Sequence, residues 1–217
     1  MKKPERFTKK LLVEGNDDQH VIWALCEKFR VRENFDVIDC GGIEQLLTQI
    51  PVRYKQSNVE IVGIIIDADV NINSRWDSLK DILTSLGFTI PNEIPIDGFI
   101  AKNIENKTVG VWIMPNNQLN GMLEDFISFL VPKDDKLMPI VDSTLENLES
   151  NNLNRYSLTH KSKVKIHTWL SWQESPGMPM GLAITKRFLT TDNSNCFFLI
   201  NWLSKLFKEL VNREMAL

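Results

Sequence analysis

The sequence predicts an α/β domain, in which a parallel sheet carries helices on both faces, followed by a mainly helical C-terminal part. In the first half, short apolar segments that fit strands alternate with segments of helical periodicity, and residues 59–66 form an almost unbroken β-branched run. In the second half only helical patterns follow one another. We therefore expect an α/β core in residues 1–130 and a helical part in residues 131–217, packed together as one unit.

The elements of the first half follow from apolar spacing and from the residues that stop each segment. In chain order we expect a strand at Phe7–Val13, a helix at Asp17–Phe29 capped by Asp17 or Asn16, a strand at Phe35–Cys40, a helix at Ile43–Ile50 closed by Pro51, a strand at Val59–Ile66, a helix at Ser74–Leu86 ended by Gly87, an edge strand or loop at Pro95–Ala101 and a strand at Val109–Met114. This order predicts parallel pairing through right-handed crossovers.

The second half carries helical patterns separated by breaks that contain Asn, Pro and Gly. We expect helices at Met122–Leu130, Ser143–Leu148, Lys161–Trp172, Pro179–Phe188 and Asn195–Leu210. No internal repeat or low-complexity linker divides the chain.

Composition excludes several classes of protein. An apolar share of 43% with 24% charged residues is that of an ordinary globular chain and excludes disorder as the main state. No apolar stretch approaches the roughly 20 residues of a membrane helix, and no signal-peptide core follows the first residues, so we expect a cytoplasmic protein without a membrane partner. The three cysteines form no C-x-x-C pair, which indicates reduced thiols.

The charge is unevenly distributed along the chain. The net charge is −3, whereas residues 151–217 carry nine basic and four acidic residues. A protein that holds cations and an anionic polymer together needs such an asymmetry, but solvated surface helices explain a local excess of lysine equally well.

Acidic residues stand where two of the expected strands end. Glu14 follows the first strand, and Gly15 after it lets the chain turn sharply and approach a ligand closely. Asp67 and Asp69 follow the most hydrophobic strand, and a period of two places both carboxylates on one side of the chain. If these two strands are neighbours, the three acids converge and repel one another, and a Mg²⁺ ion would relieve that repulsion. The alternative is helix capping and loop solvation.

These residues carry a resemblance to a known family. Leu11-Leu12-Val13-Glu14-Gly15 and Ile64-Ile65-Ile66-Asp67-Ala68-Asp69, in this order and strand context, resemble the TOPRIM domain of topoisomerases, bacterial-type primases, small ribosomal-RNA maturation nucleases and overcoming-lysogenisation-defect nucleases. The resemblance covers roughly residues 8–130. It implies that Glu14 acts as a general acid or base, and that Asp67 and Asp69 bind Mg²⁺ in a phosphodiester reaction.

The rest of the chain resembles a small stand-alone TOPRIM-like family of prokaryotes. The segments that carry this second resemblance are Gly121–Phe126 and Lys161-Ser162-Lys163 with Trp169-Leu170. No zinc ribbon, helicase segment or Walker loop accompanies them. The resemblance therefore implies a nuclease rather than a primase or topoisomerase, acting alone or with a separate partner chain; a homodimer is left open.

Two further pairs of acidic residues are candidate metal ligands. Glu124 and Asp125 follow a polar loop after the fourth strand, and each is either a second-metal ligand, for which Glu124 has the longer reach, or an acid that favours the start of its helix. Asp17 and Asp18 are expected mainly to cap the first helix, with a water-mediated metal contact as the alternative.

The densest basic segment is His160–His167. On a helix Lys163 and His167 share a face, so a lysine there can face the carboxylates and hold the scissile phosphate, with Lys161 as a second substrate contact. A solvated helix face paired with acids is the alternative.

These observations together predict a nuclease or related phosphodiester-cleaving enzyme that depends on Mg²⁺ or Mn²⁺ and acts on nucleic acid. The catalytic residues would be Glu14 and Lys163, the metal ligands Glu14, Asp67, Asp69 and Glu124, and the substrate-binding residues Gly15, Lys161 and Lys163. The alternative is a non-catalytic module that binds a nucleotide or nucleic acid through Mg²⁺. A third possibility is an interaction subunit whose acids only cap helices.

Overall fold

A five-stranded sheet forms the centre of the computed structural model, which describes residues 5–208. The strands are β1 (Lys9–Val13), β2 (Asp36–Asp39), β3 (Ile61–Asp67), β4 (Phe99–Lys102) and β5 (Thr108–Met114), in the order β2-β1-β3-β5-β4. All neighbours are parallel except β4 and β5. The prediction of an α/β fold with a largely parallel sheet is thus confirmed, and β1 and β3 are neighbours, as the convergence of the acids requires.

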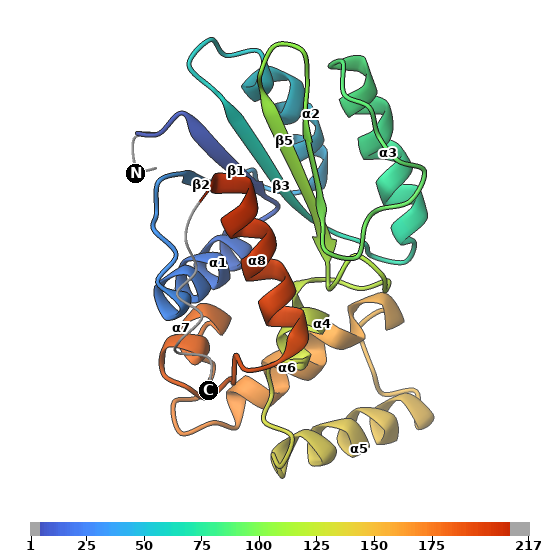
Figure 1. Ribbon diagram of the computed structural model, residues 1–217. Coiled ribbons are helices and arrows are strands. Elements are labelled where there is room, and N and C mark those ends of the chain that lie inside the picture. Colours follow the sequence, from blue (N-terminus) through green and yellow to red (C-terminus); the bar gives the residue numbers. More distant parts are fainter. Residues whose placement is uncertain (1–4, 209–217) are drawn as a thin grey trace.

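Helices cover both faces of the sheet, as predicted (Figure 1). One face carries α2 (Ile43–Tyr54) and α3 (Ile72–Ser85), and the other carries α1 (Asn16–Phe29) and α8 (Ser194–Phe207). Beyond the carboxyl ends of β3 and β5 lie α4 (Leu123–Ser128), α5 (Leu137–Ser150) and α6 (Lys161–Ser171), and α7 (Met180–Thr185) packs against α1. A short 3-10 helix, Leu158–His160, leads into α6.

Glycines in the two central strands let α8 approach the sheet closely. A Cβ atom at Gly63 would stand 2.9 Å from a methyl group of Leu206, and one at Gly110 only 2.7 Å from the same side chain. The last helix therefore joins the α/β core in one hydrophobic cluster, in which Trp202 of α8 packs beside Trp112 of β5. The division of the chain at residue 130 stays a prediction.

Four details differ from the expectations. Pro51 lies inside α2, because one further turn buries Tyr54 in the core. β4 is antiparallel, since only a five-residue loop joins it to β5. The helix expected at Ser143 begins at Leu137. The residue before α1 is Gly15, so neither Asn16 nor Asp17 is its N-cap.

The expected helix at Asn195–Leu210 is α8 up to Phe207, and its positions 209 and 210 lie outside the described residues. Cys26, Cys40 and Cys196 are free thiols, as predicted. Within residues 5–208 no helix combines the length and apolar character needed to span a bilayer.

Candidate functional site

Glu14 and Asp67 meet at the carboxyl edge of the sheet. Glu14 directly follows β1, Asp67 is the last residue of β3, and the two strands are hydrogen-bonded neighbours. The Asp67 backbone N–H donates to Glu14 Oε1 at 2.8 Å, and the N–H of Leu123, the first residue of α4, donates to Asp67 Oδ1 at 2.9 Å. The sheet and the start of α4 therefore fix both carboxylates in place.

Asp18 is a further member of this acidic edge. It lies in the first turn of α1, is 7% exposed, and its Oδ2 accepts the Gly15 N–H at 3.1 Å. Its other oxygen, Oδ1, is buried and has no hydrogen-bond partner among the described residues. The cap expected from the sequence is present, but the same side chain also faces Glu14 and Asp67. Its spacing of four residues from Glu14, across a strand-to-helix turn, is the signal in the sequence.

Asp125 takes the helix-start role that the sequence left open, whereas a metal-binding role of Glu124 stays a prediction. Glu124 is 4% exposed, and its Oε1 lies 3.6 Å from Lys163 Nζ and 4.0 Å from His167 Nε2. Asp125 Oδ2 accepts the Met122 N–H at 2.8 Å, and its other oxygen accepts the hydroxyl of Ser162 on α6. Asp125 therefore caps α4, whereas Glu124 belongs to the acidic edge.

The period of two expected from the sequence does not extend to Asp69, which lies outside the strand. The strand ends at Asp67, and Asp69 has a left-handed backbone with φ of 51°. Two backbone hydrogen bonds of 2.8 Å tie Asp69 to Gly121, and its carboxylate pairs with Arg75. Arg75 Nε also donates to the Asp67 carbonyl at 2.9 Å. The acids thus have a basic neighbour, contributed by α3, that the sequence analysis did not identify.

Burial and mutual repulsion disturb the titration of the remaining acids. Burial raises the pKa of Asp67 well above its usual range, and the charges of Asp18, Glu14, Glu124 and Asp69 raise it further. Burial and the charge of Glu14 raise the pKa of Asp18 to about 7. Burial also raises the pKa of Glu14, although the Asp67 N–H and Arg75 act against it. The protein without metal therefore holds protons at this edge near neutral pH.

Gly15 has a different role from the one expected. Its backbone is extended, with φ of −142°, and a Cβ atom there would meet only Asp18 Oδ2 at 3.5 Å. The sharp turn argued from its missing side chain is therefore not required. Its N–H is engaged by Asp18, so binding of substrate by Gly15 stays a prediction.

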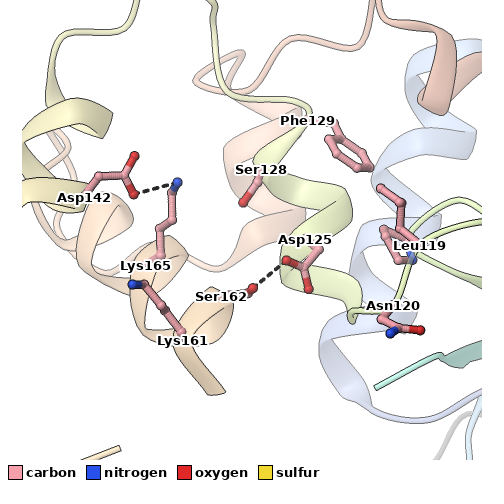
Figure 2. Close-up of a pocket in the computed structure, with 10 residues that line it drawn as sticks. Leu119, Asn120, Asp125, Ser128, Phe129, Asp142, Lys161, Ser162 and Lys165 are labelled. Atoms are coloured by element: carbon pink, nitrogen blue, oxygen red, sulfur yellow. Dashed lines mark hydrogen bonds and ion pairs between the residues drawn. The ribbon is translucent and has the colours of Figure 1, made fainter. Parts of the chain in front are cut away.

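The lysines of α6 lie near different acidic residues. Lys163 approaches Glu124, whereas Lys161 Nζ pairs with Glu149 at 2.7 Å and Lys165 Nζ with Asp142 at 2.7 Å. Lys163 and His167 share the helix face that meets the acidic edge. Lys161 and Lys165 instead line a neighbouring pocket of about 330 Å³ (Figure 2).

The donor set fits a hard cation, although the edge is no ready-made cage. Within the described residues, no three His, Cys, Asp or Glu side chains form a group that could hold a metal ion. Mg²⁺ binds through only one or two carboxylates and fills its remaining positions with water and phosphate oxygens. The unpartnered Oδ1 of Asp18 and the raised pKa values of Asp18 and Asp67 are what an acidic site shows when no cation balances it.

Comparisons with known proteins give a family and two distant structures. A search of curated proteins finds no match. One structure of the C-terminal region of the Xanthomonas campestris pv. campestris OLD protein, phased with iodine, is 15% identical and aligns over 88% of this chain and 82% of its own, with a TM-score of 0.35. A second, phased with mercury, is 12% identical over 90% and 98%, also with a TM-score of 0.35. The family model described as "Protein of unknown function (DUF3226)" matches residues 8–208, and the chain belongs to this family.

Proposed function

We infer that the chain is a metal-dependent nuclease of the TOPRIM type, with Mg²⁺ or Mn²⁺ as its cofactor and nucleic acid as its substrate. The observation that carries this proposal is the convergence of Glu14, Asp18, Asp67 and Glu124 at one sheet edge, with Lys163 beside them. The motif resemblance at the ends of β1 and β3 supports the same function.

The acids would have different roles, which their surroundings determine. Asp67 and Asp18 would hold the metal, because they are the most strongly protonated acids of the edge and gain most from a cation. Glu124 lies near enough to raise the pKa of Asp67 and Asp18 and would be a further ligand. Asp69 is a weaker candidate, since Arg75 already neutralises it. When bound, the metal would lower the pKa of a water molecule and neutralise charge on the phosphate.

Glu14 and Lys163 would act on the substrate directly. Glu14 is half-buried with a raised pKa, which suits a carboxylate that takes up or gives a proton near neutral pH. Lys163 is 54% exposed in its side chain and only loosely paired with Glu124 at 3.6 Å, so it can turn to a phosphate oxygen. Such a lysine would stabilise negative charge that develops on the phosphate.

The test combines metal binding with cleavage. Calorimetry with Mg²⁺ and Mn²⁺ should show binding at millimolar concentrations, the order expected for weak sites that substrate completes. Plasmid, single-stranded DNA and RNA should then be cleaved only with metal, and Asp67→Asn and Glu14→Gln should abolish cleavage. Asp77→Asn, an exposed acid of α3, is the matched control and should cleave normally.

The outcomes separate the alternatives. Metal binding and nucleic-acid binding without turnover would favour a non-catalytic Mg²⁺-dependent module. No metal binding by the folded wild type would leave only helix capping as the role of the acids. Activity that survives in both acid variants would contradict the proposal outright.

A further inference from the structure

A pocket beside the acidic edge is lined by both apolar and hydrogen-bonding groups. It has a volume of about 330 Å³, within the usual range of small-molecule sites. Figure 2 shows α4 as its floor, with Asp125 and Ser128 exposed to it. The loop that carries Leu119 and Asn120 forms one wall, and α6 forms the other.

The pocket lies near the candidate nuclease site, because Asp125 in its lining belongs to α4, whose first residue, Leu123, donates its N–H to Asp67. A second pocket, of about 420 Å³, shares Asn120, Asp125 and Ser162 with the first and extends to Asp69. Asp69 is joined by backbone hydrogen bonds to Gly121, beside Asn120. A strand of nucleic acid whose backbone lay along the acidic edge would therefore have its next unit within reach of the first pocket.

The two lysines that line the first pocket are already paired with acids. Lys165 pairs with Asp142, and Lys161 pairs with Glu149, each at 2.7 Å. Asp125 accepts hydrogen bonds from the Ser162 hydroxyl and the Met122 N–H. Neither lysine is free to attract a phosphate, and Asp125 keeps its negative charge, so the pocket is better suited to a neutral ligand.

The remaining groups suit a flat ring with donors and acceptors on its edge. Leu119 is 52% exposed, and with Pro115 and Phe129 it offers an apolar surface. Asn120 Oδ1 accepts the Ile72 N–H, but its Nδ2 has no partner among the described residues. The hydroxyl of Ser128 donates to the Glu124 carbonyl and keeps its lone pairs free to accept. Single-stranded bases are bound by such a combination of packing and edge hydrogen bonds.

We propose that this pocket binds one nucleobase of a single-stranded nucleic acid, next to the phosphate that lies at the acidic edge. The inference rests on the proposed function, and it adds that the substrate presents an unpaired base. A duplex without frayed ends cannot place a base in the pocket, so single strands and frayed ends are the preferred substrates.

The test measures binding of a fluorescent single-stranded DNA to the Glu14→Gln protein with Mg²⁺, so that the strand stays intact. Replacing one nucleotide by an abasic unit, moved position by position along the strand, should weaken binding at one position by about fivefold, or about 1 kcal/mol. Adding Leu119→Ala should weaken binding of the unmodified strand similarly and remove most of the penalty at that position. Leu182→Ala, on α7, is the matched control and should behave as its parent.

A second variant fills the pocket. Ser128→Phe should weaken binding of the unmodified strand but leave binding of the abasic strand nearly unchanged, and thermal melting checks that it folds. The proposal is overturned if the protein binds no single strand, if no abasic position matters, or if both pocket variants bind like their parent. Cleavage by the wild type together with any of these results would refute the pocket and leave the nuclease intact. Base-dependent binding without cleavage by the wild type would support the pocket and refute the nuclease.

Discussion

The acidic edge and the lysines of α6 carry charges that are buried to very different extents. Asp18 and Glu124 are almost fully buried, and Glu14 and Asp67 are partly buried. The α6 lysines are partly or largely exposed, and each lies within 3.6 Å of an acid. Exposed pairs change the free energy of unfolding little, whereas buried like charges destabilise the fold. Under the proposed function, the acidic edge is therefore the region where a cation would stabilise the fold.

The largest expected effect separates two acids that stand two residues apart. Asp67→Asn should lower metal-dependent cleavage by at least about 100-fold, because several kcal/mol of charge stabilisation depend on the metal. Asp69→Asn should cost at most about tenfold, because Arg75 already holds that carboxylate. Single-turnover rates with saturating Mn²⁺ measure both. Equal losses would show that Arg75 releases Asp69 to the metal.

The next effect is on stability without metal. Asp18 has a pKa of about 7 in the folded protein against 3.8 as its ordinary value, so the folded state binds more protons between these values. The free energy of unfolding should therefore fall as pH rises through this window and be lowest above pH 7. Asp18→Asn should stabilise the metal-free protein by up to about 4 kcal/mol at pH 8 and by almost nothing near pH 4, since one pKa unit corresponds to about 1.4 kcal/mol and the two pKa values differ by about three.

Urea unfolding in EDTA at both pH values measures this difference. Asp17→Asn, an exposed neighbour on the same turn, serves as control and should change little at either pH. A stabilisation of equal size at the two pH values would mean that repulsion is not its cause.

Added metal should raise the free energy of unfolding in the same pH range. At 100 times its dissociation constant, Mg²⁺ should stabilise the wild type by about 2.7 kcal/mol at pH 8, and by much less near pH 5, where protons compete for the carboxylates. The melting temperature should rise accordingly. Melting curves of Asp67→Asn should show little response to Mg²⁺, and a full response there would move the metal away from this edge.

The smallest effects are expected on α6. Lys163→Ala should reduce the salt dependence of single-stranded nucleic-acid binding by a slope of about 0.7, or about 0.9 for a duplex, and lower the cleavage rate while metal affinity stays nearly unchanged. Lys161→Ala and Lys165→Ala should change the slope less, because both lysines are held by acids of α5 at 2.7 Å. Binding titrations across salt concentrations measure the slope, and cleavage assays measure the rate. Three unchanged variants would make α6 a solvated helix face.

The sequence by itself determined the fold class and the pair Glu14 and Asp67. Apolar runs and their stop signals are local, so the strands and helices of the first half could be predicted to within a few residues. The carboxyl ends of neighbouring parallel strands lie at one edge of the sheet, so the sequence also predicts that Glu14 and Asp67 lie close together. The hydrogen bond from the Asp67 N–H to Glu14 shows that they do.

Only the tertiary structure decided which other charged residues join them. Asp69 is turned aside by a backbone bridge to Gly121 and by Arg75, which come from other segments of the chain. Asp18 becomes part of the acidic edge because folding buries it in the first turn of α1, near Glu14 and Asp67. The same holds for the lysines, since Lys163 and Lys161 have similar local sequences but face different partners. Burial and partners at long range in sequence set these outcomes, and a local spacing such as that of Glu14 and Asp18 identifies candidates without deciding among them.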